Sequence, residues 1–201
     1  MRHELRGIIA SAGFASGDRV VVGHWAVSPI GPMSDVMWAA PDGRRTLFAP
    51  DERVAAFITA IYRFDEVRVG PLEVTGGERG IDVTAGDRRV RLAAGAGWRI
   101  FFSRPPWFTR LVEAPVARVA MGVRTYGTSP SGVREWYRAD TWRPVHDGSA
   151  VVAGETLGPL APVDPPCRFG FSEPPRRPSI VAVRPLLEDP SGRLDRVVAG
   201  P

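Results

Sequence analysis

Alternation of apolar and polar side chains with a period of two constrains the fold of this chain more than any other feature. The clearest case is the segment 19–27, in which Val20 and Val22 share one face and Trp25 lies on the other. Because both faces are fairly apolar, we expect this segment to be a central strand. Turn residues separate such segments about every 8–12 positions, a spacing typical of an antiparallel meander.

The strongest hairpin signal is the turn at Pro41, Asp42 and Gly43. Proline presets the backbone, aspartate caps the turn, and glycine accepts a positive φ. The flanking segments 35–40 and 45–49 are therefore expected to pair. Further strands are predicted at residues 67–74, 81–85, 90–94, 98–103, 116–126, 133–142, 150–153 and 179–187.

Helical periodicity is clearest in the segment that begins after Pro50. Asp51 can cap a helix there, and apolar residues recur at about 3.6-residue spacing as far as Tyr62. The resulting apolar stripe predicts that this helix packs against the sheet. Residues 103–112 are expected to form a short helix, and residues 1–17 a short helix or arm.

These patterns predict a mainly β (α+β) fold. We expect an antiparallel bent sheet or a partly closed β-barrel, with one packed amphipathic helix and one or two short helices. The chain has 201 residues, of which 44% are hydrophobic, enough for one core without disulfides. Residues 1–187 are predicted to form a single β-rich domain, and residues 188–201 a solvated C-terminal tail.

The absence of three residue types from the chain excludes several chemistries. Lysine, asparagine and glutamine are absent, so all 26 basic side chains are arginine, as is typical of a GC-rich bacterial genome. Without lysine the chain cannot form a Schiff base or a Walker-type phosphate site. The net charge of +4 comes from short arginine doublets rather than a continuous stripe, so we predict no nucleic-acid partner.

Other features bear on location and cofactors. No run of 18 apolar residues occurs, so no membrane partner is expected. The single Cys167 fits a reducing compartment, and we expect a cytoplasmic protein. The three histidines and one cysteine lack metal-ligand spacing, so no metal site and no cofactor are predicted.

Two residues form a candidate catalytic pair. His24 lies on an apolar strand face, where a buried imidazole needs a partner, and Asp35 on the neighbouring hairpin could hold its tautomer. The alternative is a structural histidine bonded to backbone. Glu135 lies on a partly apolar face near Arg118 or Arg124, which predicts a buried ion pair.

Three groups of side chains are candidates for ligand binding. Arginine can pair with an anion, and tryptophan can stack on a planar ligand. The proline-rich segment 162–178 carries Phe169 and Phe171, which suggests an ordered loop that either straps the barrel or binds a ligand. The candidate ligand-binding residues are Arg104 and Trp107, Trp136 and Arg138, and Arg168, Ser172, Glu173 and Arg176.

Three functions remain open from the sequence. The first is binding of a small anionic or aromatic molecule in a barrel-like cavity. The second is a metal-independent acid–base enzyme that uses His24 and Asp35. The third is a protein-interaction scaffold that uses the segment 162–178, and a homodimer is also compatible with the sequence.

Overall fold

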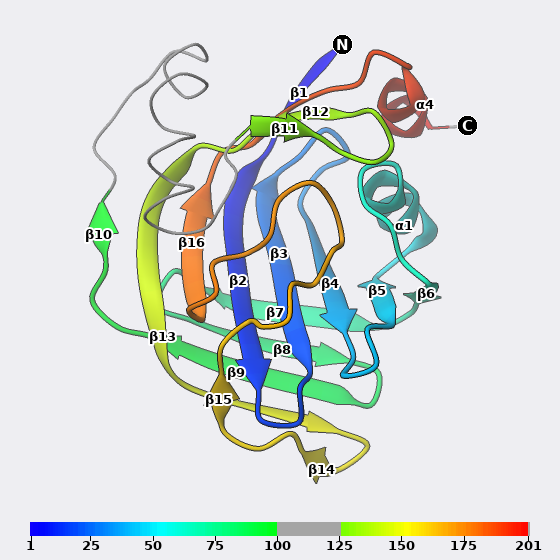
Figure 1. The fold of residues 1–201 in the computed structure, drawn as a ribbon. Coiled ribbons are helices and arrows are strands. Elements are labelled where there is room, and N and C mark those ends of the chain that lie inside the picture. The colour runs from blue at the N-terminus through cyan, green and yellow to red at the C-terminus, as the bar shows by residue number, and fades with distance from the viewer. Residues whose placement is uncertain (100–125, 201) are drawn as a thin grey trace.

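The computed structural model describes residues 1–99 and 126–200, and Figure 1 shows a mainly β molecule. The first part of the chain contains β1 (Arg2–Glu4), β2 (Arg6–Phe14), β3 (Arg19–Val27), β4 (Met33–Ala39), β5 (Arg45–Ala49), α1 (Glu52–Thr59), β6 (Glu66–Val69), β7 (Leu72–Gly77), β8 (Gly80–Ala85), β9 (Arg88–Ala94) and β10 (Trp98–Arg99). The second part contains β11 (Tyr126–Thr128), β12 (Arg134–Trp136), β13 (Ala139–Val152), β14 (Glu155–Thr156), β15 (Leu160–Ala161), β16 (Ser179–Val183), β17 (Leu186–Glu188) and α4 (Arg193–Ala199).

One large sheet forms the body of the molecule. Its strand order is β6-β5-β4-β3-β2-β16-β13-β9-β8-β7, and every pair on this path is antiparallel except β5 and β6. The helix α1 connects those two parallel strands, as a parallel pair requires a crossover. A second sheet of four short strands has the order β1-β17-β12-β11.

The large sheet curls into a half-barrel. Strands β2 to β5 run across strands β7 to β9 in Figure 1, and the long β13 curves between the two groups. Its first part pairs with β16 and its second part with β9, with a register shift between Val145 and Asp147. Buried apolar side chains from both groups, among them Val22, Trp38 and Leu92, pack between them. The fold class predicted from the sequence is confirmed.

The other face of strands β2 to β5 is covered by two structures. Helix α1 begins where predicted, since Asp51 Oδ1 accepts a hydrogen bond from the Val54 amide at 2.8 Å, and its apolar stripe is buried. The second cover is residues 162–178, which we call the strap. Its Val163, Cys167 and Phe169 are buried against β3 and β4.

Several local predictions are wrong. The N-terminal residues form β1 and β2 rather than a helix or arm, because β2 pairs with β3 over residues 6–13 and with β16 over residues 7–11. The segment 133–142 is interrupted between β12 and β13, and β13 runs on through residues 146–148, which separate the strands expected at 133–142 and 150–153. The described part of the expected solvated tail contains α4, whose Leu194 is fully buried.

Two other predictions concern residues that the structure does not describe, and a third concerns membrane-spanning helices. The helix expected at 103–112 and most of the strand expected at 116–126 lie in the range 100–125, which the structure does not describe. In the described ranges, none of the helices has the length and apolar character needed to cross a membrane.

Candidate functional site

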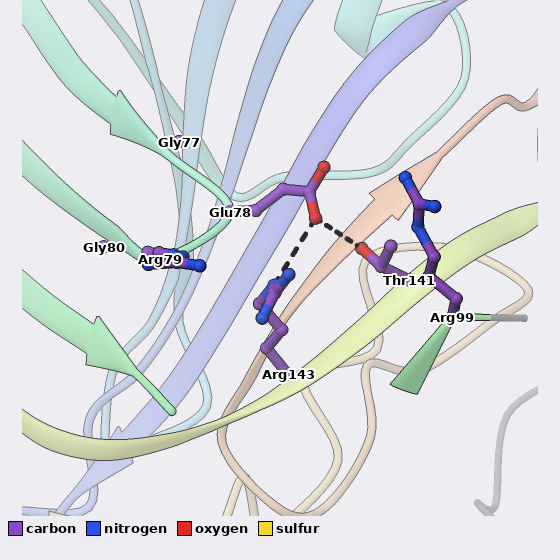
Figure 2. Close-up of a pocket in the computed structure, with 7 residues that line it drawn as sticks. All are labelled: Gly77, Glu78, Arg79, Gly80, Arg99, Thr141 and Arg143. Atoms are coloured by element: carbon purple, nitrogen blue, oxygen red, sulfur yellow. Dashed lines mark hydrogen bonds and ion pairs between the residues drawn. The ribbon is translucent and has the colours of Figure 1, made fainter. Parts of the chain in front are cut away.

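A pocket of about 530 Å³ lies where the tip of the β7–β8 hairpin meets β10 and β13. The two-residue turn between these strands places Glu78 and Arg79 at the tip. Arg99 and Thr141 enter from directly opposite positions on β10 and β13, and Arg143 follows two residues later on the same face. We call this site the arginine pocket; Figure 2 shows its lining, which consists of Gly77, Glu78, Arg79, Gly80, Arg99, Thr141 and Arg143.

Glu78 holds the centre of the arginine pocket in place. Its Oε2 accepts hydrogen bonds from Thr141 Oγ1 at 2.9 Å and from Arg143 Nε at 3.4 Å, as Figure 2 shows. Arg143 Nη1 also lies 3.5 Å from the Gly95 carbonyl oxygen. These contacts fix the Arg143 side chain and join the hairpin tip to β13.

The arginine pocket carries unbalanced positive charge. Three guanidinium groups share it with one carboxylate. Within residues 1–99 and 126–200, Arg79 and Arg99 form no hydrogen bond or ion pair with another side chain. Arginine stays protonated at any physiological pH, so this charge is permanent. The pocket can therefore attract and hold a small anion.

A second pocket, of about 700 Å³, lies at the two ends of the strap. Its arginines already have partners: Arg176 Nη2 bonds Asp164 Oδ2 at 2.8 Å, and the Arg177 guanidinium lies 5.7 Å from the ring centre of Trp142. Its two arginines thus have less capacity for an added anion than Arg79 and Arg99 in the arginine pocket.

A partly buried polar cluster lies beneath the strap, away from both pockets. Glu135 is fully buried, and its Oε2 accepts a hydrogen bond from Tyr62 Oη at 3.0 Å. The hydroxyl groups of Tyr62 and Tyr137 are in turn bonded to each other. We call these three residues the acid–tyrosine network. Burial raises the pKa of Glu135 to about 8, although hydrogen bonds from the two tyrosines oppose the shift.

Asp35 is a second buried acid on the same side of the sheet. Burial raises its pKa to about 7, against the lowering effect of its hydrogen bond from Trp25 Nε1 at 3.1 Å. The other oxygen, Oδ2, has no hydrogen-bond partner in the described protein. Both Asp35 and Glu135 therefore have an unusual tendency to stay protonated near neutral pH.

The structure separates the two candidate catalytic residues. His24 Nδ1 is bonded to Ser34 Oγ at 2.8 Å, across the β3–β4 ladder. Asp35 is the next residue after Ser34, so its side chain points to the opposite face of the sheet. His24 and Asp35 therefore do not form the expected acid–base pair.

Several candidate ligand-binding residues have structural contacts instead. In the strap, Glu173 accepts hydrogen bonds from the backbone amides of Cys167 and Arg168, at 2.7 and 2.8 Å, and so closes a tight loop. Arg176 pairs with Asp164, and Ser172 Oγ lies 3.5 Å from the Glu173 carbonyl oxygen. These contacts make the strap a structural cover that packs on its own chain.

The remaining candidates do not converge on one site. The Trp136 ring packs on Tyr126 in the small sheet, with ring centres 5.2 Å apart. The backbone carbonyl of Arg138 accepts from the Arg184 amide. Because the strand is interrupted between β12 and β13, Trp136 and Arg138 do not continue the face of Trp142. Arg104 and Trp107 lie outside the described residues.

The residues of the two sites identified in the structure were missed for different reasons. Arg79, Arg99 and Arg143 come together only through hairpin pairing and the β10–β13 ladder, which no local motif reveals. The burial of Glu135 was correctly predicted, and its described partners are tyrosines. Arg118 and Arg124, the expected ion-pair partners, lie outside the described residues. Alternation placed Tyr137 beside Glu135 on one face, and this was the available signal for the network.

Comparisons with other proteins assign no relatives. Neither protein-family models, nor curated proteins, nor solved structures give a match to this chain. In the described ranges, no group of three or more His, Cys, Asp or Glu side chains is arranged to hold a metal ion.

Proposed function

We propose that this protein binds a small anionic molecule in the arginine pocket. The observation that supports this most directly is the pair Arg79 and Arg99, two permanently charged side chains without a described partner beside the same pocket. A carboxylate or phosphate oxygen accepts hydrogen bonds from guanidinium N–H groups in a geometry that suits both partners. The pocket volume, about 530 Å³, lies in the range of small-molecule sites.

The lining restricts the chemistry of the ligand. Its side chains come from glutamate, arginine and threonine, and none is aromatic or aliphatic. An aromatic molecule would find no ring to stack on inside the pocket. Of the anionic and aromatic ligands expected from the sequence, we therefore propose a polar anion, such as a small dicarboxylate or a phosphate compound.

Isothermal titration calorimetry at low ionic strength tests the proposal, with inorganic phosphate and malonate as probes. Arg99→Ala and Arg79→Ala are each expected to weaken binding about tenfold, the effect of losing one hydrogen bond to a charged group. Arg89→Ala is the matched control, because Arg89 is also exposed but lies on β9 outside the pocket. This control should bind both anions like the wild type.

Two results would contradict the proposal. One is the absence of measurable binding of both anions to the wild type at millimolar concentration. The other is an equal loss of affinity in Arg89→Ala and Arg99→Ala, which would show attraction to the overall positive charge rather than to this pocket. If Arg79→Ala and Arg99→Ala weaken binding as expected, native mass spectrometry of protein purified from its own host would identify the natural ligand.

A further inference from the structure

The strap packs directly on the acid–tyrosine network. Gly170 lies so close to Tyr62 that a Cβ atom at this position would come within 2.6 Å of the tyrosine ring. The Phe171 ring packs on Tyr137, with ring centres 6.1 Å apart. The strap therefore covers both tyrosines of the network with uncharged groups.

The same part of the strap is bound to the segment that links α1 to β6. The Arg63 amide donates to the Phe169 carbonyl at 2.9 Å, and the Phe169 ring packs on Phe64. Arg45 Nη1 donates to the Arg168 carbonyl at 3.0 Å. Residues 168–171 thus close over the network as one continuous layer, and movement of this layer would admit water to Glu135 and its tyrosines.

Ionisation of Glu135 is unfavourable while the strap is closed. It is fully buried, and its Oε1 has no hydrogen-bond partner in the described protein. The groups that act on it are the hydroxyls of Tyr62, from the segment after α1, and Tyr137, from the link between β12 and β13. Asp35, on β4, acts on Tyr137. No arginine or histidine in the described residues contributes a compensating charge to Glu135.

We propose that the acid–tyrosine network is a proton-dependent latch, which holds the strap closed while Glu135 carries a proton and loosens it when Glu135 ionises. An ionised carboxylate in this position is buried and has no counter-ion among residues 1–99 and 126–200, so opening of the strap provides the hydration it needs. Opening and loss of one proton are therefore linked.

The linkage fixes the direction and range of the effect. Burial raises the pKa of Glu135 in the closed state to about 8, from 4.5 for a solvated glutamate. Between these values, the equilibrium constant for opening rises about tenfold per pH unit, and above pH 8 it levels off.

Cys167 provides a probe for this opening. It is the only cysteine of the chain, it lies in the strap, and it is 3% exposed. Burial raises the pKa of its thiol to about 12, so the closed strap suppresses alkylation. The experiment measures the rate of Cys167 alkylation by iodoacetamide from pH 5.5 to 9, divided at each pH by the rate for the denatured protein.

The wild type should show a normalised rate that rises steeply up to about pH 8 and then becomes constant. Glu135→Gln should remove this rise, because glutamine keeps the shape but does not titrate. Glu155→Gln, an exposed glutamate on β14, is the matched control and should keep the rise. Tyr137→Phe removes a hydroxyl that lowers the pKa of Glu135, so it should move the plateau to higher pH.

Three outcomes would overturn the proposal. They are a flat profile in the folded wild type, an unchanged rise in Glu135→Gln, and a rise that coincides with loss of the near-ultraviolet circular dichroism of the whole protein. If Glu135→Gln does not fold, Tyr137→Phe decides, because an unmoved plateau contradicts a role for the network.

Discussion

The arginine pocket and the acid–tyrosine network use charge in opposite ways. The arginines stand at the solvent edge of the half-barrel, where water supports their permanent charge and an anion can approach. Glu135 is fully buried and has no counter-ion in the part of the chain that the structure describes, so burial favours its neutral form. Access to solvent therefore suits the arginine pocket to binding an ion, and exclusion of solvent suits the acid–tyrosine network to holding a proton.

The largest expected difference is in how the stability of the protein depends on pH: the buried acids Asp35 and Glu135 should affect it, and the arginines of the pocket should not. Because burial raises the pKa values of Asp35 to about 7 and of Glu135 to about 8, the folded state binds these protons more tightly than the unfolded chain. Their stabilisation is full below about pH 4 and is lost as the pH rises towards these values. Each group should contribute up to about 1.4 kcal/mol per pH unit between pH 5 and 7.

Urea unfolding at several pH values measures this effect. Asp35→Asn and Glu135→Gln should each reduce the slope of the unfolding free energy against pH, and the double variant should nearly remove it. Arg79→Ala and Arg99→Ala should leave the slope unchanged, because arginine does not titrate in this range. A rise in the unfolding free energy of the wild type from pH 5 to 7 would contradict the raised pKa values of Asp35 and Glu135.

A smaller effect is expected from filling the contact between strap and network. Gly170→Ala would press a methyl group on the Tyr62 ring, and overpacking of this kind costs about 1–3 kcal/mol. Gly70→Ala is the matched control, since nothing lies within 4 Å of the added Cβ. Thermal unfolding should show a lower midpoint for Gly170→Ala than for Gly70→Ala, and equal midpoints would mean that the strap yields without cost.

The smallest effect should come from the carboxylate of the arginine pocket. Glu78→Gln removes a negative charge but keeps an oxygen that can accept from Thr141 and Arg143. Phosphate should then bind about two- to fivefold more tightly at low salt, and added salt should diminish the gain. Calorimetry measures both, and weaker binding by the variant would show that the charge of Glu78 is needed to position Arg143.

The sequence predicted the regular parts of the fold better than the sites. Alternation identified β3 as central, the turn at Pro41 identified the β4–β5 hairpin, and Asp51 marked the start of α1. These features depend on residues that are neighbours in the chain, which is why local patterns revealed them.

The errors arose where distant pairing overrides local pattern. Residues 146–148 contain Asp147 and Gly148 and look like a turn, but pairing with β9 carries the strand through them. His24 and Asp35 were matched by their closeness in the hairpin, yet a shift of one residue sends them to opposite faces. The arginine pocket needs three separate segments, so no single stretch of sequence contains its signal.

The position of β16 has a consequence for synthesis of the protein. This strand lies between β2 and β13, although it follows both of them by many residues in the chain. Until residues 179–183 leave the ribosome, the edges of β2 and β13 that later pair with β16 have no partner. The backbone groups along those two edges are then open to pairing with another nascent chain. The half-barrel therefore completes its strand pairing only late in translation. We expect chaperones that shield unpaired strands to increase the yield of folded protein most before β16 has been synthesised.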